Sequence, residues 1–225
     1  VLDRLRLRAA EIRLAGSAAI APDGLPRSFD LTGRIESQDG DPVRLPVSRD
    51  PVEIAAADLE LSFDETAGER WEATITAEAL DTPGADIARI ALTGDGTIAR
   101  RDGANRVTAG VKLSAAGISF ADPAVTEAIG DRLDGRAEID WQSGAPVDLA
   151  LLQLAGRGLS LTAAGRIDGL DSALRVEGEA VASIAALSAF SALAGRPLGG
   201  SADLSVTGNG AVLGGDFDLT ASGET

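Results

Sequence analysis

The stretch Arg70-Trp-Glu-Ala-Thr-Ile-Thr-Ala-Glu-Ala-Leu80 predicts a β-strand with one apolar face and one polar face. Its charged residues and threonines alternate with the apolar residues Trp71, Ala73, Ile75, Ala77 and Ala79. A period of two places successive side chains on opposite faces of a strand. Alternation of this kind is typical of antiparallel sheets that keep one face in water. The stretch therefore predicts antiparallel β-structure.

The same alternation covers most of the chain on both sides of this stretch. It recurs in residues 29–36, 58–64, 106–114, 159–168, 174–177 and 216–220. Between the alternating segments lie groups of Gly, Pro, Asp and Ser that predict turns. These turns are expected at residues 21–24, 37–40, 81–84, 101–103, 143–146, 168–169 and 208–210. We expect a meander of antiparallel strands, apolar on one side.

A pattern of short apolar helix, glycine and alternating strand occurs twice. When Gly135 is aligned with Gly200, the two copies are 65 residues apart, and Ile139 then aligns with Leu204. Repetition at a fixed period is typical of repeat architectures, in which one unit cannot bury its own apolar face. We therefore predict three segments: a β-rich segment 1–120, a repeat unit 121–182, and a second, truncated repeat unit 183–225.

The two helices are expected near 122–130 and 183–194. Asp122 is a predicted N-cap, and Pro123 suits the first helical position. Ser183 is the predicted N-cap of the second helix, and Gly195 is expected to end it. Each helix is expected either to pack against the sheet or to lie along the rim of a groove.

Composition excludes several classes of function. The net charge is −15, which argues against nucleic acid, because Lys and Arg must neutralise its phosphates. The chain contains no His and no Cys, so His-dependent catalysis and thiolate chemistry are excluded. Its many carboxylate pairs are interpreted as solvated strand faces. We predict a protein that is not an enzyme and has no catalytic, metal or cofactor site.

The apolar content is unusual in kind. Hydrophobic residues make up 44% of the chain, but aromatic residues only 3%. Two packed sheets usually fill their interior with large side chains, whereas the inward positions here are often Ala or Gly. Small side chains leave room on an apolar face. The residues predicted to line this face are Trp71, Ile75, Val111, Ile139, Leu161 and Leu204.

The segment Gly195-Arg-Pro-Leu-Gly-Gly200, followed by Ser-Ala-Asp-Leu-Ser-Val206-Thr-Gly208, resembles the repeats of the TamB proteins of the AsmA-like family. So does Phe120-Ala-Asp-Pro-Ala124, which leads through Gly130 into a strand. The abundance of Arg and Ala, with Lys112 the sole lysine, is similar to alphaproteobacterial versions. The resemblance covers most of the chain, but its motifs are degenerate and identify no functional residue.

The resemblance implies an elongated antiparallel sheet, curled like a taco around an apolar groove. It implies a periplasmic segment of a longer protein that is anchored in the inner membrane outside this segment. The implied role is to carry phospholipid between the membranes through contacts with acyl chains. A further implied role is outer-membrane protein assembly and secretion, with the barrel TamA as partner.

Two other functions stay open from the sequence. The strands could form a scaffold or chaperone surface that offers sheet edges to outer-membrane barrel strands. They could also form a structural stalk, although repeats of such stalks are usually shorter than 65 residues.

Overall fold

The computed structural model describes residues 2–8, 12–22, 25–36, 41–45, 52–101, 104–168, 175–211 and 217–224. Most of these residues lie in antiparallel strands, and two short helical segments accompany them. The prediction of a mostly β, antiparallel fold with two short helices is confirmed. Two compact units are present: Val1–Ile98 with Leu113–Ala121, and Ala99–Lys112 with Asp122–Thr225. The three segments predicted from the sequence stay a prediction.

The first unit is an open meander in which consecutive strands pair side by side. The order along its ladder is β1-β2-β3-β5-β6-β7, and the short β4 pairs with β5 beyond the end of β3. The strands of this unit are β1 (Leu2–Arg8), β2 (Ile12–Ile20), β3 (Pro26–Glu36), β4 (Val43–Leu45), β5 (Val52–Asp64), β6 (Arg70–Thr82) and β7 (Ala85–Arg101). Strand β8 (Ala104–Phe120) contributes residues to both units, and so does β7, whose residues 99–101 belong to the second unit.

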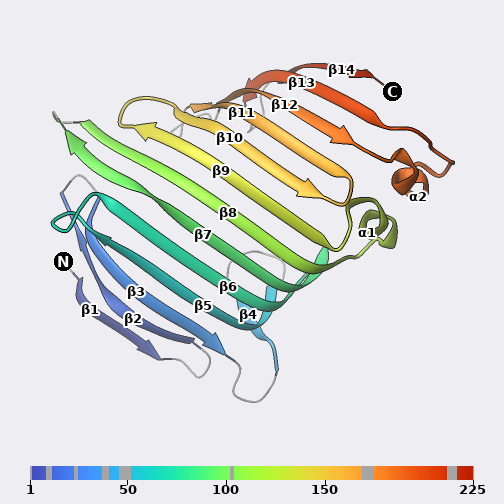
Figure 1. The fold of residues 1–225 in the computed structure, drawn as a ribbon. Coiled ribbons are helices and arrows are strands. Elements are labelled where there is room, and N and C mark those ends of the chain that lie inside the picture. The colour runs from blue at the N-terminus through green and yellow to red at the C-terminus, as the bar shows by residue number, and fades with distance from the viewer. Residues whose placement is uncertain are drawn as a thin grey trace. The chain divides into compact units, whose positions relative to one another are not determined.

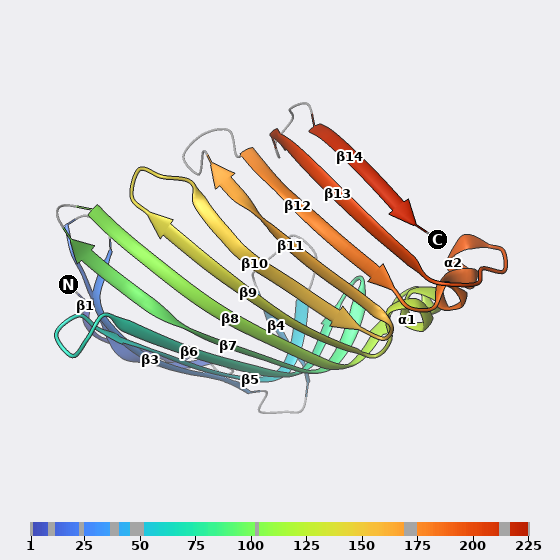
Figure 2. The same cartoon turned by 45° about the horizontal axis from the view of Figure 1, so that its top comes forward.

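The second unit is also an open meander, and its strands lie side by side in sequence order (Figures 1 and 2). These strands are β9 (Arg132–Gln142), β10 (Val147–Gly156), β11 (Leu159–Asp168), β12 (Arg175–Ile184), β13 (Ala202–Ala211) and β14 (Phe217–Glu224). Helix α1 (Pro123–Ile129) precedes β9, and the 3-10 helix η1 (Leu187–Phe190) with α2 (Ser191–Ala194) precedes β13. The helices contact each other at one end of the strands (Figure 2).

The helix–glycine–strand pattern predicted from the sequence is present twice. Asp122 caps α1, because its Oδ1 accepts a hydrogen bond of 2.9 Å from the Ala124 N–H. Gly195 ends α2 in the left-handed conformation, as glycine does at many helix ends. The predicted start of the second helix is wrong. Ser183 is in β12, where its hydroxyl donates to Asp203 at 2.6 Å, and the helical turn begins only at Leu187.

The core of the first unit lies where β4 joins the meander. Val43 and Ile54 are cross-strand partners, and each is only 2% exposed. Ala77 completes the buried cluster. One predicted face assignment on β6 is wrong, because Ala79 is exposed and has a left-handed φ of 51°. This residue shifts the alternation, so Leu80 packs against the core instead.

The turn predicted at 208–210 is also wrong, because these residues lie within β13. The turn at 143–146 is confirmed, and the one at 81–84 is shorter than expected, since β6 and β7 leave only 83–84 between them. The turns predicted at 21–24, 37–40, 101–103 and 168–169 lie wholly or partly outside the described residues. No helix in the described ranges has the length and apolar character needed to cross a membrane.

Three carboxylates form a row across β5, β6 and β7. Asp81 pairs in register with Asp86 on one side and Glu53 on the other, and Arg44 forms an ion pair with Glu53 at 3.0 Å. The pKa of Asp81 is raised, chiefly because the charge of Asp86 opposes its ionisation, with smaller contributions from burial and from Glu53.

We predict that Asp81→Asn stabilises the first unit at neutral pH. A carboxyl with a raised folded-state pKa contributes stability at low pH that is lost as the pH rises through that pKa. The variant removes this loss, so its stability relative to the unsubstituted protein should increase as the pH rises through the acidic range. An unchanged pH dependence would contradict the prediction. Asp30→Asn, also on a strand of the first unit, serves as the control.

Candidate functional site

Cross-strand register divides the strands of the second unit into one apolar and one polar face. In one transverse row, Leu154 on β10 faces Leu161 on β11, which faces Ala182 on β12, which faces Leu204 on β13. The neighbouring row contains Leu152, Ala163, Ala180 and Val206. A further row near the other end of these strands contains Trp141, Val147, Ile167 and Val176. We call this side of β9–β13 the apolar face.

Within the second unit, no described part of the chain covers the apolar face. Its side chains on β9–β13 are half-buried, and Leu204 is 43% exposed. A second layer packed on this face would bury the side chains beneath it. Because sheets normally bury their apolar face against another layer, this face is suited to bind apolar material from outside the chain.

One row of the apolar face has glycine on three successive strands. Leu149 on β10 faces Gly165, which faces Gly178 on β12, which faces Gly208 on β13. The strands approach closely at this row. A Cβ atom added to Gly178 would lie 2.5 Å from the carbonyl oxygen of Ala164, and one added to Gly165 would lie 2.5 Å from that of Glu177. The glycines therefore permit the close pairing of these strands. They also leave this row without side chains on β11, β12 and β13.

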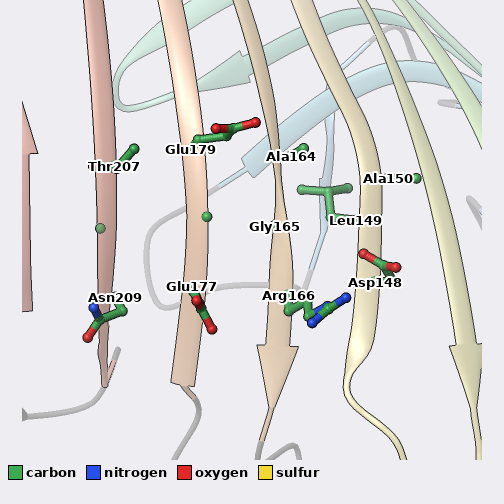
Figure 3. Close-up of a pocket in the computed structure, with 12 residues that line it drawn as sticks. Asp148, Leu149, Ala150, Ala164, Gly165, Arg166, Glu177, Glu179, Thr207 and Asn209 are labelled. Atoms are coloured by element: carbon green, nitrogen blue, oxygen red, sulfur yellow. The ribbon is translucent and has the colours of Figure 1, made fainter.

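A hollow of about 220 Å³ lies at this glycine row. Its sides are apolar residues of the two adjacent rows, Ala163, Ala180 and Val206 on one side and Ile167 and Val176 on the other. We call the hollow the glycine slot. Figure 3 shows the Leu149 side chain between the ribbons of β10 and β11, beside Gly165, where it closes one end of the slot.

The opposite face carries charged and polar side chains in register. Asp148, Arg166, Glu177 and Asn209 form a row across β10–β13 (Figure 3). They border a wide, shallow hollow of about 760 Å³. All four side chains are exposed to solvent, and no group of three carboxylates in the described ranges is arranged to hold a metal ion. This face is best explained by solvation.

An ion pair joins β8 to β9 on the polar face. The Arg106 guanidinium donates to both carboxylate oxygens of Asp140, with Nε 3.1 Å from Oδ1. These hydrogen bonds lower the pKa of Asp140 and raise that of Arg106. Because Arg106 lies on the polar face, alternation along β8 places Val111 on the apolar side.

Three of the six residues predicted to line an apolar groove lie on the apolar face, and Val111 lies on the corresponding side of β8. Leu161 and Leu204 share a row, separated by Ala182, and Ile139 lies at the β9 end of the glycine row. Val111 is half-buried on β8. Trp71 and Ile75 belong to the first unit, where they face Phe63 and Leu59 of β5, respectively.

Because Ile139 and Leu204 align in the two copies of the sequence pattern, they are predicted to be buried to a similar depth, and this prediction is wrong. Ile139 is half-buried, whereas Leu204 is 43% exposed. The transverse row of Leu204 reaches β9 at Gly135, and that of Ile139 reaches β13 at Gly208. The register of β10 shifts next to Leu149 in its pairing with both β9 and β11. An alignment of the two copies along the sequence does not contain this shift, so it does not predict which residues share a row.

Sequence reasoning missed the glycine slot. Gly208 was assigned to a turn, and Gly165 and Gly178 carry no apolar side chain that a strand pattern would detect. The sequence signal for the slot is a glycine on the apolar face of three successive strands. Recognising that these glycines lie side by side requires the register between the strands. Comparison with known proteins adds no assignment, because no family model, curated protein or solved structure matches the chain.

Proposed function

We propose that the apolar face of β9–β13 binds the acyl chains of phospholipids. The observation that carries the proposal is an apolar face, five strands wide, that no described part of the second unit covers. Apart from Trp141 its side chains are aliphatic, and they present no ionisable group, so they match a hydrocarbon better than a polar substrate.

The energetics favour weak contact along the whole face. A methylene removed from water contributes about 0.8 kcal/mol, and a chain lying on an open face loses only part of its exposure. Binding is therefore the sum of many small contributions rather than the result of one polar contact. Weak and uniform contacts allow a lipid to move along a surface instead of being held at one point.

On the basis of the resemblance to TamB proteins, we propose that this activity takes place in the periplasm, in a protein anchored in the inner membrane. We propose that the chain carries phospholipid towards the outer membrane and supports outer-membrane protein assembly with TamA as partner. The polar face and the low content of aromatic residues are consistent with a conduit of this kind. No chemical reaction is part of the proposal.

Photo-crosslinking tests the proposal with matched pairs of adjacent residues. A benzophenone amino acid replaces Leu161 or Ile139 on the apolar face, and Thr162 or Glu138 on the polar face. The protein is mixed with vesicles of phosphatidylethanolamine, irradiated and analysed by mass spectrometry. We expect lipid adducts at 161 and 139 and none at 162 and 138.

A charge on the apolar face provides the second test. We predict that Leu161→Asp weakens phospholipid binding at least about tenfold, because an unpaired carboxylate then lies against hydrocarbon. Thr162→Asp adds the same charge on the opposite face and should change binding less than about twofold. Circular dichroism checks that both variants fold.

Other outcomes would overturn the proposal. Adducts at 162 and 138 alone would mean that lipid contacts the polar face. Absence of adducts at all four positions in the folded protein would remove the conduit function. Under the alternative of a scaffold that presents sheet edges to barrel strands, lipid would be absent and peptide adducts would form at those edges.

A further inference from the structure

The glycine slot differs from the rest of the apolar face because it has a floor, two sides and a closed end. Its floor is Gly165, Gly178 and Gly208, and Leu149 closes it at β10. The slot extends from β10 to β13, which is three spacings between neighbouring strands. At about 4.8 Å for each spacing, its length is roughly 14 Å. It therefore runs across the strands rather than along them.

The width of the slot suits a single hydrocarbon chain. The rows on its two sides lie four residues apart along each strand, which is about 13 Å between Cα atoms. Val206 and Ala180 project from one side, and Ile167 and Val176 project from the other. These side chains occupy part of that distance, and a ligand atom in van der Waals contact lies about 4 Å from them. The space that remains between the two sides is about one polymethylene chain wide. A ring system would not reach the floor.

We propose that the slot holds one unbranched alkyl chain, lying across β11–β13 with its terminal methyl group against Leu149. This inference rests on the proposed lipid-binding function and specifies how the ligand lies. Arg166, Glu177 and Glu179 also adjoin the slot, but alternation along β11 and β12 directs their side chains to the opposite face, so the bound part of the ligand is neutral hydrocarbon. Leu149 and Gly208 are then the residues that determine which chains fit.

The test is a series of monoacyl phosphatidylcholines from octanoyl to stearoyl, each used below its critical micelle concentration. Trp141 lies on the same face beside Val147, so its fluorescence in a Trp71→Phe background reports binding. We expect affinity to rise with each methylene, by no more than about fourfold because the slot is open on one side, and then to level off when the chain reaches Leu149. Leu149→Ala should extend the rise to longer chains.

Gly208→Leu and Gly210→Leu form a matched pair on β13. Both positions are on the apolar face, but Gly208 is part of the slot and Gly210 is not. We expect Gly208→Leu to weaken binding of the best chain at least tenfold and Gly210→Leu to weaken it less than threefold. Circular dichroism shows whether each variant folds, and Leu149→Ala tests the slot without filling it.

The failures of the two proposals can be distinguished. A rise in affinity without levelling, with equal effects of Gly208→Leu and Gly210→Leu and no effect of Leu149→Ala, would overturn the slot while lipid still binds the face. Absence of binding for every chain, together with absence of crosslinks at 161 and 139, would overturn the lipid-binding function itself.

Discussion

Replacing Ile54 by Ala is expected to lower the free energy of unfolding of the first unit by about 2–5 kcal/mol. Ile54 is 2% exposed and packs with Val43 and Ala77, its neighbours from β4 and β6. Removing three carbons from this site loses their burial and leaves a cavity that adjacent strands fill only in part. In a single-layer meander few other residues are buried, so the loss is a large share of the unit's stability.

The two tryptophans of the chain make this measurement specific, because Trp71 lies in the first unit and Trp141 in the second. Ile54→Ala is made in a Trp141→Phe background, and unfolding in urea is followed by the fluorescence of Trp71. Ile20→Ala removes the same atoms from a side chain that is 63% exposed and should change stability by no more than about 0.5 kcal/mol. Equal effects of the two variants would contradict the assigned core.

Gly178→Ala is expected to destabilise the second unit by about 1–2 kcal/mol, although the change adds only one methyl group. Two effects oppose each other. Gly→Ala in an ordinary backbone conformation stabilises by about 0.4–1 kcal/mol through the unfolded chain. Here the new Cβ atom would lie 2.5 Å from the Ala164 carbonyl oxygen and 3.1 Å from the Gly165 Cα atom. Overpacking of this kind costs about 1–3 kcal/mol, so the clash outweighs the entropic gain.

Gly199→Ala is the matched control for this variant. A Cβ atom added to Gly199 meets no other atom within 4 Å, and its φ is not in the left-handed region. We expect it to leave stability unchanged or to raise it by up to about 1 kcal/mol. Both variants are followed by Trp141 fluorescence in a Trp71→Phe background. If Gly178→Ala were as stable as Gly199→Ala, the close approach of β11 and β12 would be disproved.

The stability test and the slot are linked through the same glycines. Gly165 and Gly178 are needed for strand pairing, so their presence does not by itself indicate a ligand. Gly208 is the cross-strand partner of Gly178. A larger side chain at Gly208 would fill the slot, so its substitution tests whether a ligand occupies that space. The function-directed substitutions are therefore placed at Gly208 and Leu149, while Gly178 reports on the fold. This separation lets a loss of binding be distinguished from a loss of structure.

Much of the fold follows from local sequence. The alternation in 70–80 and in 159–168 specifies strands because a period of two separates the faces of an extended chain. Asp122 and Gly195 mark helix ends because a carboxylate satisfies free N–H groups and glycine adopts the left-handed conformation without strain. The sequence also predicts that Leu161 and Ile139 lie on the apolar face, because the preference of a side chain for burial is a property of that side chain.

Other features depend on contacts between distant residues. Ala79 is exposed because its left-handed backbone shifts the alternation of β6, and no residue type at that position predicted this. Ser183 ends a strand and binds Asp203 instead of capping a helix, because pairing of β12 with β13 extends to Ile184. In both cases tertiary packing overrides a local preference that was reasonable by itself.

The sequence by itself determined the antiparallel strands, the repeated helix–glycine–strand pattern and the separation of apolar from polar side chains. Those properties are set by each residue and its near neighbours. Only the tertiary structure decided that Gly165, Gly178 and Gly208 align beside Leu149, and that Leu204 shares a row with Leu161 rather than with Ile139. Register is a relation between strands, and an irregularity such as the one in β10 changes it without any signal in the neighbouring strands.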